Sequence, residues 1–131
     1  MSSYSVKRID EIEAIYGGAF KRARAELGVE SFGIQVIDMP ANYGDYPEHD
    51  HSHDNQEEVY LVISGGGEIE IDGERFPLDP DHIARVGVEA KRKVWPGPAG
   101  IRLVVIGGVP GEAYTAPDIT KLGEPDPMAA S

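Results

Sequence analysis

The sequence predicts an all-β domain in which an antiparallel barrel or sandwich follows a short helical segment. Short apolar runs rich in β-branched residues are separated by glycine and proline turns. The clearest run, Glu68-Ile69-Glu70-Ile71, alternates polar and apolar residues and ends at Asp72-Gly73, a strong hairpin signal. The predicted strands cover residues 32–39, 58–63, 68–71, 75–78, 83–88, 91–95 and 101–106.

The chain is expected to divide into three parts. Apolar residues recur at helical spacing over residues 7–28, with a division at Gly17-Gly18 and a stop at Gly28. We therefore expect a helical segment over residues 1–30 that packs on a barrel. The barrel should cover residues 31–109, and a proline-containing extended tail should follow over residues 110–131.

Composition excludes several classes of function. The 131 residues include no cysteine, so disulfides, thiolate nucleophiles and cysteine-based metal sites are excluded. A formal charge of −11 argues against nucleic acid and anionic membranes as partners. We see neither a signal peptide at the N-terminus nor an apolar run of about 18 residues, so a cytoplasmic protein is expected.

The segment from Glu48 to His53 is the strongest functional signal. His49, His51 and His53 are two residues apart, so an extended chain would place all three imidazoles on one face. A glutamate at the start of the return strand, Glu57 or Glu58, would come back beside them. Histidine nitrogens with a carboxylate form a suitable site for Mn, Fe, Ni, Cu or Zn. The alternative interpretation is an exposed, solvated histidine loop.

These residues resemble the first cupin motif, in which HxH is followed by three or four residues, a glutamate, six residues and a glycine. His51-x-His53, Glu58 and Gly65 fit this spacing, and the similarity extends from about residue 31 to residue 108. The resemblance implies a cupin double-stranded β-helix, a jelly-roll barrel. It also implies metal ligands at His51, His53 and Glu58, with His49 as a further candidate at the rim. The leading glycine of the motif does not fit, because Gly44 is one residue too far from His51.

The second cupin motif is incomplete in this chain. Lys91 stands where the resemblance would place the last histidine ligand, and a protonated lysine repels a metal. Three outcomes stay open: the metal binds through three residues, Lys91 turns outward with its basic neighbours, or Lys91 enters the barrel and pairs with Glu58. Tyr60, Lys91 and Arg102 are candidate residues of the ligand pocket, although a surface position is favoured for Arg102. His82 is expected on the surface, and Trp95 and Phe76 are expected to fill the barrel.

Two functions therefore follow from the sequence. The first is a metal-binding cupin that takes a small organic molecule, with oxygenase or isomerase chemistry if it is an enzyme. The second is a metal-free small-molecule binding or accessory cupin in which Lys91 replaces the lost ligand. The resemblance also makes a homodimer plausible, with the helical segment and the tail as the contacting parts.

Overall fold

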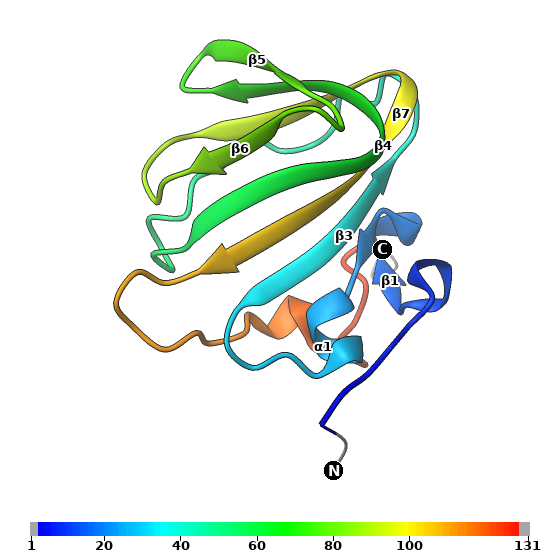
Figure 1. Cartoon of the computed structure of the whole chain (residues 1–131), viewed down its shortest axis with the longest axis vertical. Coiled ribbons are helices and arrows are strands. Elements are labelled where there is room, and N and C mark those ends of the chain that lie inside the picture. Colours follow the sequence, from blue (N-terminus) through cyan, green and yellow to red (C-terminus); the bar gives the residue numbers. More distant parts are fainter. Residues whose placement is uncertain (1–2, 129–131) are drawn as a thin grey trace.

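The structure, a computed structural model, describes residues 3–128 as one curved antiparallel sheet with short segments packed against one end (Figure 1). Residues 1–2 and 129–131, the outer ends of the predicted first and last parts, lie outside the described residues. Within residues 3–128, seven strands pair in the order β1-β2-β3-β7-β4-β5, and β6 pairs with β4. The predicted all-β class and jelly-roll barrel are confirmed.

Two long strands, β4 (Glu57–Ile71) and β7 (Arg92–Gly108), form the centre of the barrel. They pair from Glu57 opposite Gly108 to Ile71 opposite Arg92. Each replaces two of the predicted shorter strands, because the chain bends at register shifts without leaving the sheet. Gly67 lies at such a bend, where a Cβ atom would come 2.0 Å from the carbonyl oxygen of Trp95. Only glycine permits this approach.

The shorter strands complete the two faces of the barrel. Strand β3 (Gly33–Met39) pairs with β7, whereas β5 (Glu74–Leu78) and β6 (Ile83–Val86) both pair with β4. The predicted hairpin at Asp72-Gly73 is confirmed: both residues have positive φ, 50° and 87°. That conformation matches the twist of the flanking strands.

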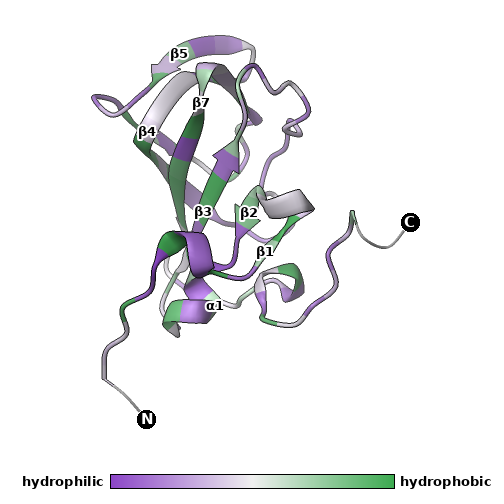
Figure 2. Cartoon of the chain, turned by 90° about the vertical axis from the view of Figure 1, so that its right-hand side faces the viewer, coloured by the Kyte–Doolittle hydropathy of each residue, from purple (hydrophilic) through white to green (hydrophobic). Residues whose placement is uncertain are grey.

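Side chains on the concave face form the main core. Tyr60, Ile69, Leu78, Val94 and Leu103 are completely buried there. In Figure 2 the apolar segments of β3, β4 and β7 alternate with polar ones, as expected for strands with one buried face.

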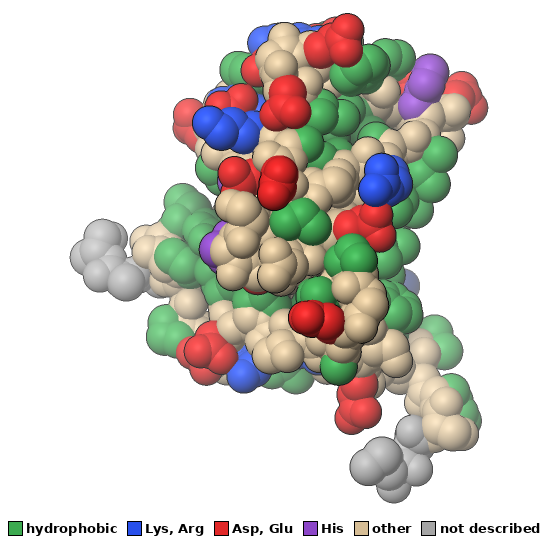
Figure 3. Space-filling view, turned by 90° about the vertical axis from the view of Figure 1, so that its left-hand side faces the viewer, with side chains coloured by type: hydrophobic (Ala, Val, Ile, Leu, Met, Phe, Trp, Pro, Cys, Tyr) green, Lys and Arg blue, Asp and Glu red, His purple; other side chains and the backbone are tan. Residues whose placement is uncertain are grey.

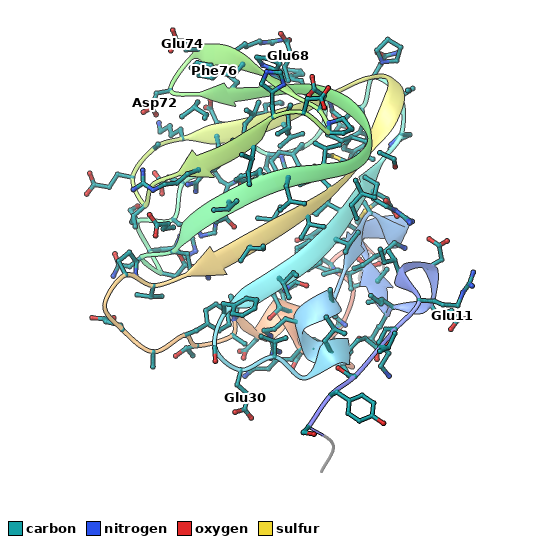
Figure 4. All side chains as sticks on the ribbon, viewed as in Figure 1. Glu11, Glu30, Glu68, Asp72, Glu74 and Phe76 are labelled. Carbon is teal, nitrogen blue, oxygen red and sulfur yellow. The ribbon has the colours of Figure 1, made fainter. Side chains whose placement is uncertain are left out.

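Two aromatic side chains predicted to fill the barrel are not buried in it. Trp95 follows the inward-facing Val94, so alternation points it outward, where Arg75 and Lys93 cover its ring. Phe76 is 40% exposed on β5, near Glu68 at the top of the molecule in Figure 4. The prediction for Trp95 was wrong because it used residue type without the parity of the strand. Phe76 pairs with the buried Ile69 and has the parity of the buried Leu78, so parity does not explain its exposure.

The N-terminal segment is less helical than predicted. Its α-helix, α1, covers only Ala23–Leu27, and it ends at Gly28 as expected. The preceding residues form 3₁₀ turns η1 (Ile9–Glu11) and η2 (Tyr16–Gly18). Strands β1 (Ala14–Ile15) and β2 (Phe20–Lys21) extend the sheet beyond β3. Positive φ at three successive residues, Tyr16 to Gly18, turns the chain back and prevents a continuous helix.

The C-terminal arm, defined here as residues 109–128, returns beneath the barrel to the N-terminal segment (Figure 1). It contains one 3₁₀ turn, η3 (Asp118–Thr120). Arg22, only 1% exposed, donates to the carbonyl oxygens of Ile119 and Glu124, both at 2.8 Å. Among the described residues, the structure contains no helix long and apolar enough to cross a membrane.

Candidate functional site

A cavity of about 550 Å³ opens at the end of the barrel that the arm covers. Its walls come from β3, the histidine segment, the start of β4, the end of β7 and the arm. Most of the lining is apolar, and Phe20, Ile37, Met39, Val105 and Ile119 form much of it. Polar groups gather on one wall, around His49, His51 and Glu58. A mostly apolar cavity with a few convergent polar groups is typical of a small-molecule site.

His49, His51 and Glu58 converge at that wall. One ligand atom from each lies within 4.8 Å of the others, and His51 Nε2 is 3.1 Å from Glu58 Oε1. Backbone pairing places both histidines, because His49 exchanges two hydrogen bonds with Arg92 and His51 N–H donates to the carbonyl of Val88. Glu58 lies near the start of β4 and faces inward.

The opposite nitrogen of each imidazole is already engaged. His49 Nδ1 is 3.0 Å from the carbonyl oxygen of Pro47, an acceptor, so this nitrogen carries the proton. His51 Nδ1 is 2.9 Å from Asp54 Oδ1, which holds a proton there in the same way. In the neutral form of each imidazole, Nε2 therefore presents a lone pair. Fixing the ring through Nδ1 is the usual support for a metal-binding histidine.

A second layer of hydrogen bonds holds the acidic groups. Gln56 Nε2 donates to Asp54 Oδ2 at 2.9 Å, and Tyr60 OH donates to Glu58 Oε1 at 2.7 Å. Burial, together with the adjacent charge of Glu58, keeps the pKa of Tyr60 well above its usual value, so this hydroxyl remains a donor. Each carboxylate is thus fixed in one orientation.

The electrostatic environment shifts the pKa values of His49 and His51 in opposite directions. Burial lowers the pKa of His49, which favours its neutral form. Burial acts in the same direction on His51, but the carboxylates of Glu58 and Asp54 outweigh it and raise the pKa of His51. Burial would raise the pKa of Glu58, yet His51, Tyr60 and Arg92 outweigh burial and lower it.

The structure does not group His53 with Glu58. The side chain of His53 is 72% exposed, and its Nε2 lies 3.5 Å from Asp54 Oδ2. The chain curls after His51, because the N–H groups of Asp54 and Asn55 both bond to the carbonyl of His51. This turn ends the extended alternation on which the His51–His53 pair was predicted. The structure also groups His51, His53 and Asp54, a more exposed set at the rim.

The basic residue inside the barrel is Arg92 and not Lys91. Lys91 is exposed, and its backbone N–H donates to Asp72 Oδ1 at 2.8 Å. Arg92 is completely buried, with Nη1 3.7 Å from Glu58 Oε1 and Nη2 bonded to the carbonyl of Gly87. Of the three outcomes left open for Lys91, the structure shows the outward one, but Arg92 does not turn outward with it and lies inside instead. The bridge between His49 and Arg92 sets the observed register.

The other predicted residues lie apart from the cavity lining. Tyr60 does not line the cavity but donates a hydrogen bond to Glu58, which does. Arg102 lies on the opposite face of the sheet, where Nε and Nη2 bind Asp38 at 2.7 and 2.9 Å and Nη2 also contacts Asp10. The surface interpretation of Arg102 was therefore the better one. His82 is a surface residue as expected, with Nδ1 2.8 Å from Asp79 Oδ1.

Solved structures with the same architecture identify the fold. A cupin protein from Bacteroides fragilis superposes with a TM-score of 0.68 at 24% identity, over 90% of this chain and 96% of that one. The chain has the cupin fold. An RmlC-like cupin from Desulfovibrio desulfuricans gives a TM-score of 0.58 at 17% identity, covering 79% and 95% of the two chains.

Similarity to a named enzyme is more limited. A chain from the crystal structures of the DMSP lyases RdDddP and RnDddQII gives a TM-score of 0.53 at 20% identity. That match covers 66% of this chain and 45% of the other. The sequence matches no protein-family model and no curated protein.

The residues of this cupin site fit a divalent metal. Two donors about 2.1 Å from one ion, at tetrahedral to near-right angles, lie about 3.0–3.4 Å apart, which agrees with the 3.1 Å between His51 and Glu58. Within the described part of the chain, His51 Nε2 is buried and has no hydrogen-bond partner of suitable geometry. A buried nitrogen that lacks a partner while its other nitrogen is fixed suits a metal ligand.

Proposed function

We propose that this cupin binds a divalent transition metal through His49, His51 and Glu58 and acts on a small organic molecule held in the adjoining cavity. One observation carries the proposal: the free Nε2 atoms and the Glu58 carboxylate converge, while the Nδ1 atoms are fixed from behind. Two histidines with one carboxylate suit iron and related metals and leave coordination positions open. When bound, the metal would supply Lewis acidity or a centre for O₂ chemistry.

The residues of the chain have separate roles in this proposal. Asp54 holds the proton on His51 Nδ1, and Gln56 keeps Asp54 in place. Tyr60 limits rotation of Glu58 through its hydroxyl hydrogen bond. The apolar walls and the arm exclude water from the substrate, so that polar interactions at the histidine wall become stronger. Isomerase and oxygenase reactions both fit these roles.

Arg92 favours a second candidate function, a metal-free binding cupin. Its guanidinium group lies 3.7 Å from Glu58 and would compete with a metal for that carboxylate. In this alternative, protonated His51 and Arg92 neutralise Glu58 and Asp54, and the cavity binds its ligand without metal. Arg92, and not Lys91, would then replace the missing histidine.

Metal analysis of four single variants tests the proposal. Chelator-free protein should contain or take up about one Mn, Fe, Ni, Cu or Zn ion per chain, measured by elemental analysis after dialysis. His49→Ala and His51→Ala should lose this metal, because each removes one of three protein ligands. The matched controls, His53→Ala and His82→Ala, should retain it, because those side chains are exposed and lie outside the three-residue set.

Two results would contradict the metal proposal in different ways. Loss of metal in His53→Ala with retention in His49→Ala would support the ligand set suggested by the sequence. Absence of metal from the wild-type protein, even after incubation with each ion, would support the metal-free alternative. In that case Arg92→His should create binding, since it restores a third imidazole beside Glu58.

A further inference from the structure

Gln35 places a buried amide on the apolar wall of the cavity. Odd-numbered residues of β3, including Gln35, Ile37 and Met39, line the cavity. The intervening Val36 packs on the other face against Ile12 and belongs to a second core cluster. Gln35 is only 8% exposed, so its polar group is almost entirely withdrawn from bulk water.

The amide oxygen of Gln35 has no partner among residues 3–128. Oε1 is buried without a hydrogen bond, in contrast to Gln56 Nε2, which binds Asp54. The register places Gly33, Ile37 and Val105 around Gln35 on this face of the sheet, and none of them has a polar side chain. The hydroxyl of Tyr114 lies over Gly33 and also lines the cavity, yet it forms no hydrogen bond with the amide oxygen of Gln35. A buried amide without a partner is unfavourable unless a ligand satisfies it.

Strand register gives the separation between Gln35 and the histidine wall. Gln35 pairs with Val105, which pairs with Tyr60, whereas Glu58 lies two residues further along β4. Two strand spacings and two residue steps correspond to about 12 Å between the Cα atoms of Gln35 and Glu58. Both side chains point into the same cavity, so one small molecule can contact both.

We infer that Gln35 binds a neutral hydrogen-bonding group, such as a hydroxyl, at the far end of the ligand. The inference rests on the proposed function for the other end, where an oxygen donor such as a carboxylate faces His49, His51 and Glu58. Between them, Ile37 and Val105 contact an apolar middle. The substrate class is therefore a small amphipathic molecule with two polar ends. Gln35 selects this molecule over an analogue that lacks the polar group at the far end.

A matched pair of probes tests this inference: octanoate and 8-hydroxyoctanoate, which differ by one terminal hydroxyl. Isothermal titration of the Mn²⁺-loaded wild-type protein should show about tenfold tighter binding of the hydroxylated probe, as expected for one net hydrogen bond. Gln35→Leu should abolish or reverse this preference, since leucine retains the volume without the amide. Ile34→Val, on the opposite face of β3, should leave it unchanged.

A further variant separates this inference from the proposed function. His51→Ala should weaken both probes equally and preserve the preference for the hydroxyl, because Gln35 is intact. If His51→Ala binds both probes more weakly but keeps the preference for the hydroxyl, the result bears on the metal site and not on Gln35. Equal affinity of the two probes for wild-type protein, the same preference in Gln35→Leu, or no binding of either probe would overturn the role of Gln35.

Discussion

Arg22 holds the C-terminal arm against the N-terminal segment, and replacing it with methionine should release the arm. The guanidinium is buried and makes three contacts: carbonyl oxygens of Ile119 and Glu124, and Glu13 Oε2 at 2.6 Å. The same oxygen of Glu13 accepts the N–H of Gly123 at 2.9 Å. Arg22→Met removes these charged hydrogen bonds but keeps an apolar stem of similar length.

The size of the effect follows from the two bonds to carbonyl oxygens. A hydrogen bond from a charged donor contributes about 1.5–3 kcal/mol, so their loss should reduce the free energy of arm docking by about 3–6 kcal/mol. This corresponds to roughly two to four orders of magnitude in local opening. The barrel core contains none of these contacts and should keep its stability. The released carbonyls would be hydrated once the arm leaves, so the loss stays local.

Hydrogen exchange followed by mass spectrometry measures this prediction directly. Amides in residues 117–128 should exchange faster in Arg22→Met, whereas those of β4 and β7 should be unchanged. The control is Arg85→Met, because Arg85 is 69% exposed and its ion pair with Glu57 is worth at most about 1 kcal/mol. Unchanged protection of the arm, or an equal loss throughout the barrel, would refute the role assigned to Arg22.

Two further predictions concern the support of the site and the response to acid. Gln56→Leu should lower metal affinity about 10–100-fold, because Asp54 loses the donor that orients it; competition with a chelator measures this, and an unchanged affinity would contradict it. Acidification should release the arm, because two carboxylates that hold it have lowered pKa values. Hydrogen bonds from the N–H groups of Met128 and Tyr16 lower the pKa of Asp126. Hydrogen bonds from the N–H of Gly123 and from Arg22 lower the pKa of Glu13. These carboxylates stabilise the docked arm fully when the pH is above their ordinary pKa values of 3.8 and 4.5. The stabilisation is lost as the pH falls from there through the lowered pKa values of the docked state. Hydrogen exchange of the arm, corrected for the intrinsic effect of pH, should show earlier opening than the barrel, and simultaneous opening would argue against it.

Strand alternation made most of the barrel predictable from sequence. Runs such as Glu68-Ile69-Glu70-Ile71 carry their own periodicity, and Asp72-Gly73 carries its own turn chemistry. Both signals are local, so they can be recognised without knowing which strands pair. The helical spacing over residues 7–28 was misleading, because Ile15 and Phe20, two of the apolar residues with this spacing, lie in short strands at the edge of the sheet.

The site was less predictable because it depends on register between distant segments. The sequence located the histidine segment and Glu58, but the curl after His51 separates His53 from that glutamate. Arg92 was missed because a one-residue difference in alignment exchanges the inside and outside of a strand. Gln35 carried a weak signal that could have been found: a lone amide among the apolar residues of one strand face, on the same parity as Ile37 and Met39.

The continuous pairing of β4 with β7 also constrains the order in which the protein can assemble. The partners nearest in sequence, Ile71 and Arg92, are 21 residues apart, whereas Glu57 and Gly108, at the other end, are 51 apart. Closing the shorter loop costs less chain entropy, so the pairing of β4 with β7 should start at Ile71 and Arg92 and proceed toward Glu57 and Glu58. The carboxylate beside His51 would then be positioned late during folding. Metal or ligand should consequently slow unfolding more than it accelerates folding, because it stabilises contacts that form after the transition state.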